Sequence, residues 1–573
     1  MRAPSLVLGG LLAGVLAGAS AHAQSMPYQA TGDDAVSGDQ DADARDKGGL
    51  HGGHSARVGG SSARTTIRPY IEASQNLLAQ ITPGNDVLTY TTLAAGVDAT
   101  LAGRRTQGQV SVRYEHRFVE KGRVGDTNTI SGMARVSHQI VPRTLSIDVG
   151  ALAARTRLEA NGSTSLNPYS PNDSVSQIYS VYAAPQLTTH VGDVGVNASY
   201  MAGYSKLDQK NGYRPAADGT RVDVFDHSIM QSAQVSAGVK PGVILPVGLT
   251  ASAGWDREDI SNLDQRIDDK RVGLRATLPV SRTVQLVGDV GWEHIRVSSR
   301  DALRGPDGVT PVIGRDGRYV TNKSAPRQIA YDSDGLTWDV GVMWRPSRRT
   351  SLSAFVGRRY DSTTYFGSFS YAPNTRSAFS LSVYDGISGF GSGLDNALRG
   401  VPTDFTAMPN LGGGGFSGCG LGAAGGGCVN GALSSVNSSV FRARGVNATY
   451  GFAMGRLRLA VGAGYAHRRF IAAPGTVLGV ANGTVDQNWY VDAGVSAPID
   501  RESSFSVAVF DTWYDSGTST LGRTNAYGGY ASYFRRLADR LTATASVGID
   551  GVSRQLTADQ LEVTGLLGLR YTL

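Results

Sequence analysis

The sequence lacks several features that would assign it to a common class of protein. Beyond residue 24 it has no run of about 18 apolar residues, so an ordinary membrane helix is not predicted. The formal net charge is +6, but lysine and arginine occur singly, without a basic stripe or an aromatic platform. Nucleic acid is therefore not expected as a partner.

Catalytic and metal-binding signatures are also missing. The histidines in strand-like segments stand outside any G-x-S-x-G or H-E-x-x-H context, so no enzyme, metal site or cofactor is predicted. These histidines are His116, His138, His227, His294 and His467. A Ser/His or Asp/His cluster formed by distant strands, as in an outer-membrane hydrolase, stays open at this point.

The first residues contain a targeting signal. Arg2 is followed by the apolar stretch LVLGGLLAGVLAG and by Ala21-His22-Ala23, which predicts a secretory signal peptide over 1–23 with cleavage before Gln24. The apolar stretch is shorter than the roughly 20 residues of a spanning helix. In an exported chain the two cysteines, Cys419 and Cys428 in one glycine-rich loop, predict a disulfide.

Residues 24–64 are polar and glycine-rich and predict a disordered periplasmic segment. Asp39, Asp41 and Asp43 resemble the start of a calcium loop, but Ala44 stands where glycine is required and no glutamate follows at the twelfth position. Calcium is therefore not expected, and nearby histidines are interpreted as solvated.

A period of two dominates the rest of the chain. In residues 335–360, Leu336, Trp338, Val340, Val342 and Trp344 alternate with polar or small residues, and the pattern resumes after a basic turn. This alternation predicts a hairpin with one apolar face. Similar segments of ten to fifteen residues continue to the C-terminus, which predicts about 22 strands (range 18–24) in one domain over 65–573.

The connections alternate between short and long. Short turns are predicted at 104–106, 142–144, 281–283, 374–376 and 455–456, and long loops near 160–172, 208–227, 298–332, 388–442 and 471–486. This arrangement is typical of a transmembrane antiparallel β-barrel in the outer membrane of a Gram-negative bacterium, with long extracellular loops and short periplasmic turns. A very large soluble β protein is the alternative.

A lipid-facing barrel gives roles to particular side chains. The apolar rows would face lipid and lipopolysaccharide, and tryptophans near strand ends would form interfacial girdles. These tryptophans are Trp255, Trp292, Trp338, Trp344 and Trp489. At the C-terminus, Leu569, Tyr571 and Leu573 alternate to the last residue and resemble the signal that barrel assembly machinery reads, although leucine stands where phenylalanine is usual.

Three stretches carry a resemblance to a known family. They are RPYIEASQNLLAQI (68–81) with DVLTYTTLAAGVDA (86–99), QIYSVYAAPQLTTHVGDVGVNASY (177–200), and WRPSRRTSLSAFVGRRYDSTTYFGSFSY (344–371). The chain resembles the outer-membrane β-barrel family associated with exosortase and PEP-CTERM sorting systems, whose members accompany exopolysaccharide clusters in Gram-negative bacteria. The resemblance implies architecture and setting, and it implies no site residues. If the barrel exports a polymer, periplasmic export proteins are expected as partners.

Residues between the apolar positions are expected to line the lumen. The lumen-lining candidates are Arg68, Arg113, Arg117, Arg135, Arg271, Arg275, Asp289, Glu293, Asp339, Arg458 and Asp492. Their mixed signs do not build the single-sign ring of a strongly ion-selective channel. Such a wall suits a polysaccharide of low charge, and it equally suits general solute diffusion.

The loop over 388–442 is unusual because of its glycine content. Gly420, Gly422 and Gly425 match a dinucleotide-binding spacing by form only, since neither the strand nor the helix of that motif is predicted around them. The loop either folds into the pore as a constriction or gate, or covers the outer surface. The predicted function is a passage for a polymer or solute linked to exopolysaccharide export. The alternatives are a non-conducting structural or anchoring barrel and a general porin.

Overall fold

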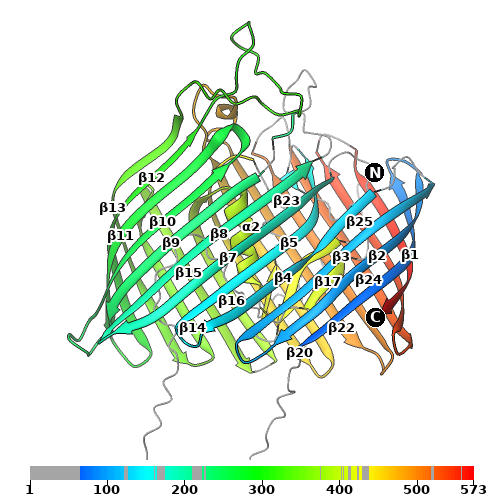
Figure 1. Ribbon diagram of the computed structural model, residues 1–573, viewed down its shortest axis with the longest axis horizontal. Coiled ribbons are helices and arrows are strands. Elements are labelled where there is room, and N and C mark those ends of the chain that lie inside the picture. The colour runs from blue at the N-terminus through cyan, green and yellow to red at the C-terminus, as the bar shows by residue number, and fades with distance from the viewer. Residues whose placement is uncertain are drawn as a thin grey trace, which may run out of the picture.

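The alternating segments form one closed antiparallel β-barrel of 22 strands (Figure 1). The computed structural model describes residues 65–573, with gaps at 122–126, 160–161, 164–174, 210–221, 225–226, 375, 402, 404–405, 411–414, 423–424, 429–437, 518–521 and 556–557. The first strand pairs with the second and with the last, so the sheet closes on itself. The predicted fold class is confirmed. The predicted signal peptide and polar segment (1–64) lie outside the described residues.

The barrel strands are numbered in chain order. The first eleven are β1 (Thr66–Thr82), β2 (Val87–Ala102), β3 (Thr106–Lys121), β4 (Thr127–Val141), β5 (Leu145–Glu159), β7 (Val175–Val191), β8 (Val194–Gln209), β9 (His227–Val239), β10 (Gly248–Ile260), β11 (Gln265–Pro279) and β12 (Val284–Ser299). The others are β13 (Gln328–Ser347), β14 (Thr350–Arg359), β15 (Ser362–Asn374), β16 (Ser377–Ser388), β20 (Phe441–Met454), β21 (Leu457–Phe470), β22 (Val485–Pro498), β23 (Ser503–Asp515), β24 (Arg523–Ala538), β25 (Leu541–Arg554) and β26 (Gln560–Thr572). Strand β6 (Gly162–Ser163) is a short extension that pairs with β5.

The register explains which side chains face outward. In the β13–β14 pair, Val340 lies opposite Val356, and the next position brings Asp339 opposite Gly357. Val340 and Val356 are about half exposed, whereas Asp339 is 4% exposed. Successive side chains point to opposite faces of a strand, so the apolar row covers the outside of the barrel and the polar row faces the lumen. Among the described residues, no helix is both long and apolar enough to cross a bilayer.

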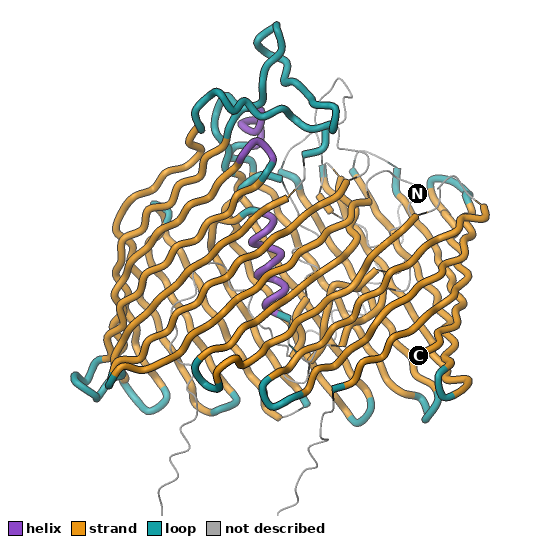
Figure 2. The backbone as a smooth tube through the Cα atoms, in the orientation of Figure 1, coloured by secondary structure: helices purple, strands orange, loops and turns teal. Residues whose placement is uncertain are grey.

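The two rims of the barrel differ in their connections (Figure 2). The turns predicted at 104–106, 142–144, 281–283, 374–376 and 455–456 all lie between strand ends of one rim, the short-turn rim. The opposite, long-loop rim carries the connections predicted to be long, including residues 300–327, which project beyond the strands. Two short 3-10 helices, η1 (Asn262–Asp264) and η2 (Val477–Ala481), also belong to this rim.

Tryptophans mark the outer surface of the barrel, with Trp344 near the short-turn rim and Trp292 and Trp338 near the middle of β12 and β13. All five tryptophans predicted for the girdles lie on the outward face of their strands. Trp255 and Trp292 donate hydrogen bonds from their indole nitrogens to Asp268 and Asp334, at 2.9 and 2.6 Å. A tryptophan with one apolar side and one polar partner suits the membrane–water interface.

The connection between β16 and β20 lies partly inside the barrel. It contains helix α2 (Phe390–Gly400) and a separate three-stranded sheet of β17 (Thr406–Asn410), β18 (Gly415–Gly422) and β19 (Gly425–Cys428). The backbone of α2 lies beside the strands from β5 to β10, and β18 lies beside β4 and β5. We call α2 and β17–β19 the inserted segment. The sequence left open whether this loop folds into the pore or covers the outer surface. Helix α2 lies inside the barrel, as the first of these predictions requires (Figures 1 and 2).

Candidate functional site in the lumen

The strand register places the predicted lumen-lining residues on the inner face of the barrel. Each alternates with outward apolar neighbours, as Arg68 does with Ile67 and Arg275 does with Leu274. The structure brings some of them into direct contact, whereas Arg68, Arg458 and Asp492 stand in other parts of the wall. The residues so placed are Arg68, Arg113, Arg117, Arg135, Arg271, Arg275, Asp289, Glu293, Asp339, Arg458 and Asp492.

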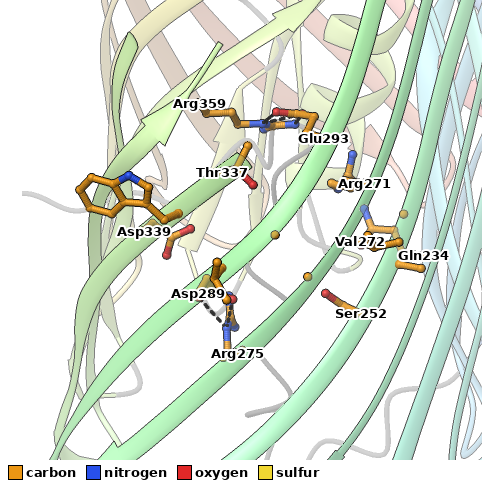
Figure 3. A pocket seen from close by; sticks show the side chains of 16 residues that line it. Gln234, Ser252, Arg271, Val272, Arg275, Asp289, Glu293, Thr337, Asp339 and Arg359 are labelled. Carbon is orange, nitrogen blue, oxygen red and sulfur yellow. Dashed lines mark hydrogen bonds and ion pairs between the residues drawn. The ribbon is translucent and has the colours of Figure 1, made fainter. Parts of the chain in front are cut away.

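The largest group of charges lies on five adjacent strands, β10 to β14 (Figure 3). We call it the charged wall patch. It consists of Asp256, Asp269, Arg271, Arg275, Asp289, Glu293, Asp339 and Arg359. Cross-strand register pairs opposite charges directly, because Arg271 lies opposite Glu293 and Arg275 lies opposite Asp289. Opposite charges at facing positions are favourable on a sheet.

Arg359 connects the upper part of this patch. Its Nε lies 2.7 Å from Oε1 and 2.8 Å from Oε2 of Glu293, and its Nη2 lies 3.0 Å from Oδ2 of Asp269. All three side chains are at most 5% exposed. Arg359 lies on β14, Glu293 on β12 and Asp269 on β11, and β13 lies between β12 and β14. The guanidinium therefore links strands that are not all neighbours in the sheet.

The remaining arginines complete the pairing. Arg271 donates to Asp269 at 2.9 Å and also to Asp256. Glycine makes this possible, because a Cβ at Gly254 would lie 2.9 Å from Nε of Arg271. Arg275 donates to both oxygens of Asp289 at 3.0 Å. Glycines among the charged positions therefore leave room for the long side chains to lie flat along the wall.

The charged wall patch borders a small cavity of about 50 Å³, which is also lined by Gln234, Ser252 and Thr337 (Figure 3). The lining presents donors and acceptors close together, with carboxylates and guanidinium groups already paired. Paired charges exert little net field, but their remaining lone pairs and N–H groups can bind hydroxyl groups. The arrangement therefore suits a neutral polar ligand better than an ion.

Further ion-pair groups lie elsewhere on the inner wall. Near the β1–β26 junction, Arg113 contacts Glu72 at 2.7 Å and Glu115 at 3.1 Å, and Arg117 contacts Glu115 as well. On β21–β23, Arg468 donates to Asp486 at 2.8 Å. Side chains of both charge signs therefore occur together at several places on the described wall.

Helix α2 meets the wall through its N-terminus. The carboxylate of Glu258, on β10, accepts hydrogen bonds from the backbone N–H groups of Gly389 (2.9 Å) and Gly391 (3.0 Å), and from Ser392 Oγ (2.6 Å). Ser228 Oγ on β9 also donates to it, at 2.7 Å. The first N–H groups of a helix have no intrahelical acceptor. Here a carboxylate from the barrel supplies one, where the helix dipole also favours negative charge.

The other end of α2 is also bound to the wall. The guanidinium of Arg135 on β4 donates to the backbone oxygen of Val401, the residue after the helix. Arg135 also donates to Asp148 at 3.2 Å, and Tyr182 donates to the same carboxylate. Between the two ends, apolar side chains of the helix enter a buried cluster with the inward residues of β5, β7, β8 and β9. These helix residues are Phe390, Leu394, Ala397 and Leu398.

Asp395 is the fully buried acidic residue of α2. Ser180 Oγ donates to it at 2.6 Å, and a Cβ at Gly203 would lie 1.8 Å from its Oδ2. Burial raises the pKa of the Asp395 carboxyl to about 7, and the nearby Glu258 carboxylate adds to the increase. At neutral pH both protonation states of Asp395 are therefore populated.

Several residues of the lumen were not predicted. Strand segments were cut short in the sequence at Trp255 and Arg271, so Glu258 and Asp269 fell outside them. Continuing the alternation to the observed ends, Ile260 and Gln265, places both on the inner face. The contacts of Asp395 could not be predicted from the sequence, because they join α2 to strands about 200 residues earlier in the chain.

Other sequence expectations have mixed outcomes. The strand-like histidines, such as His138 and His294, lie on the outward face of their strands. Among the described residues, no group of three His, Cys, Asp or Glu side chains could hold a metal ion. The β18–β19 register places the backbone of Cys419 opposite that of Cys428, and the disulfide stays a prediction. Leu569, Tyr571 and Leu573 are exposed on the outside of β26 and just beyond it.

Comparisons with known proteins give structural likeness alone. No family model matches the chain, and no curated protein matches it. The ferric-catecholate import receptor Fiu of E. coli K12, open form, has a TM-score of 0.41 at 10% identity, over 88% of this chain and 81% of that chain. The FrpB iron transporter of Neisseria meningitidis, F5-1 variant apoprotein, has 0.41 at 11% identity, over 88% and 81%. OmpT of Vibrio cholerae with loop L8 deleted has 0.25 at 8% identity, over 89% and 99%. At these values the likeness does not extend to what those proteins bind.

Proposed function

We propose that the barrel forms a passage for a polymer or solute across the outer membrane and serves exopolysaccharide export. The observation that supports this proposal is the inner wall, which carries charged and hydroxyl side chains over β10 to β15 along strands whose outer face is apolar, while α2 packs on apolar inward residues of β5, β7, β8 and β9. A wall of this kind is compatible with a water-filled lumen. The setting of polysaccharide export comes from the family resemblance of the sequence.

The wall chemistry supports a neutral substrate rich in hydroxyl groups. Each guanidinium of the wall patch lies against a carboxylate, as Arg275 Nε does against both oxygens of Asp289, so the patch leaves no positive charge for an anionic substrate. Beside the patch, inward serines of β14 and β15 face each other across the strands, with Ser351 Oγ 2.7 Å from Ser370 Oγ and Ser353 Oγ 2.9 Å from Ser368 Oγ. Hydroxyl groups both donate and accept, so they exchange partners readily with sugar hydroxyls.

A non-conducting structural barrel is the second candidate. The observation that favours it is the inserted segment, whose helix α2 occupies part of the lumen and is bound to the wall at both ends. A general diffusion porin is a third reading of the same polar wall. The export passage, the structural barrel and the diffusion porin differ in which molecules cross the barrel. Two measurements distinguish them.

The first experiment measures polysaccharide outside the cell and in the periplasm of a strain that lacks the gene, with the complemented strain as control. The proposal expects polysaccharide to be lost outside and retained inside. The second measures the conductance of the purified full-length chain in planar bilayers. Unchanged secretion with a conducting barrel would leave a general porin, and unchanged secretion without conductance would leave a structural barrel.

A further inference from the structure

We infer that Glu258 is a positioning residue that holds α2 against the lumen wall and thereby sets the size of solute that the barrel admits. The inference deepens the proposed function and rests on it, because a size limit has meaning only for a passage. It concerns contacts between α2 and strands β4, β5 and β7 to β10.

The first argument is the number of bonds that converge on one carboxylate. Glu258 accepts from two backbone N–H groups at the start of α2, from the Ser392 hydroxyl and from Ser228 on the neighbouring strand. Gly389, which precedes the helix, has no side chain that could cap it. Glu258 is 3% exposed, so water does not readily replace it as an acceptor. The start of α2 is therefore satisfied only when the helix lies against β10.

The second argument is steric fit on both partners. A Cβ at Gly391 of the helix would lie 2.4 Å from Ser228 Oγ, and a Cβ at Gly150 of the wall would lie 2.3 Å from the Tyr182 ring and 3.0 Å from Leu398. A Cβ at Gly203 would collide with Asp395. Real Cβ atoms do not approach so closely. Glycines on the helix and on the wall thus allow a close approach that a loosely placed loop would not need.

The third argument is that the helix is held along its whole length. Arg135 binds the backbone oxygen of Val401 at the lower end, while Leu394 and Leu398, both at most 1% exposed, pack between the ends. Two polar contacts separated by an apolar interface fix a position, whereas a single contact would fix only a hinge. The helix therefore forms a fixed constriction along one side of the lumen.

Releasing one end should widen the passage without opening the barrel. The strands themselves pair independently of α2, through a complete set of backbone ladders from β1 to β26. Glu258 lies on the inner face, so its substitution leaves the apolar outer face unchanged. The size limit should then relax toward that of a barrel without the inserted segment.

The test compares the full-length chain with Glu258→Ala, Glu258→Gln and a variant in which a short Gly-Ser turn replaces residues 389–440. Asp98→Asn is the control, because Asp98 is an inward carboxylate on β2 that pairs with Arg570 of β26, seven strands from Glu258 around the barrel. Folding is verified by heat-modifiable migration on gels. The readouts are single-channel conductance, the size of the largest neutral dextran that enters proteoliposomes, and tryptic cleavage after Arg399.

We expect Glu258→Ala to raise conductance several-fold, to admit larger dextrans and to speed cleavage after Arg399. Glu258→Gln should lie between, since an amide oxygen still accepts but carries no charge. Asp98→Asn should match the native chain. If the turn variant conducts while Glu258→Ala behaves as the native chain in all three readouts, the inference is overturned and the passage stands. If the turn variant does not conduct, the proposed passage itself fails.

Discussion

At the scale of single residues, the lumen is organised by arginines that each serve more than one carboxylate. Arg359 binds Glu293 and Asp269, and Arg271 binds Asp269 and Asp256. Buried carboxylates that share a cation are stable only while the cation is present, because each is desolvated and close to another negative charge. The wall is therefore sensitive to the loss of one guanidinium.

Substituting Arg359→Ala should destabilise the barrel by about 3 kcal/mol, because it leaves two buried carboxylates without their common partner. Urea-induced unfolding from lipid vesicles measures this change. Arg358→Ala is the matched control, since Arg358 is the adjacent residue, is exposed and faces outward; its effect should stay within about 0.5 kcal/mol. Equal effects of the two substitutions would contradict the assignment of Arg359 to a buried network.

A second residue-scale prediction concerns pH. The pKa of Asp395 is raised from 3.8 to about 7, so its contribution to the docking of α2 is fully present below about pH 4 and is lost as pH rises through 7. Among described residues, Ser180 donates a hydrogen bond to this carboxyl, Ser205 lies beside it and Glu258 is a charged group near it. The native barrel should therefore show a higher, noisier conductance at pH 8 than at pH 5.

Asp395→Asn removes the titrating group and keeps the shape of the side chain. Its conductance should vary much less between pH 5 and pH 8 than that of the native chain. An undiminished pH dependence in this variant would assign the effect to another group of the lumen.

At the scale of elements, hairpins follow from local sequence and the inserted segment does not. Alternation of apolar and polar residues predicted the strands, and short polar segments such as 142–144 predicted the turns between them. Strand ends were predicted less well, because on the long-loop side the strands continue beyond the apolar belt with charged outward residues, as β10 does with Arg257 and Asp259. Helix α2 has only eleven residues and is rich in glycine, so its stability comes from the wall.

Gly203→Ala tests this dependence from the side of the wall. A Cβ there would lie 1.8 Å from Oδ2 of Asp395, so α2 must move away from β8. Tryptic cleavage after Arg399 should become faster in the folded barrel. Gly288→Ala on β12 is the control, because its Cβ would meet nothing within 4 Å. Cleavage at the native rate in Gly203→Ala would show that the helix is not seated on β8 in solution.

At the scale of the whole molecule, the apolar outer face requires a lipid environment around the barrel. Its apolar rows, with their outward tryptophans, would expose far too much hydrophobic surface in water. Alternation of apolar residues predicted this belt, and together with the lengths of the connections it predicted the barrel that the belt covers. It did not predict the contacts inside, since ion pairs such as Arg359 with Glu293 depend on strand stagger, which no local pattern encodes.

Val340→Arg tests the lipid-facing assignment. Val340 is 52% exposed within the apolar outer row. A guanidinium at this depth should cost about 2–4 kcal/mol in vesicle unfolding experiments, because it must leave water for hydrocarbon. Ser353→Arg places the same charge on the inner face and should cost much less. A small cost for both would indicate that water, and not lipid, covers Val340.

The pairing of β1 with β26 joins residues about 500 positions apart, such as Tyr70 with Thr572. All other neighbours in the barrel are consecutive barrel strands. An incomplete chain would therefore keep nearly all of its hairpins and still be unable to seal, leaving two rows of unpaired peptide groups facing hydrocarbon. The barrel can therefore close only after β26 has been synthesised and has paired with β1. This last strand includes Leu569 and Tyr571 of the predicted assembly signal.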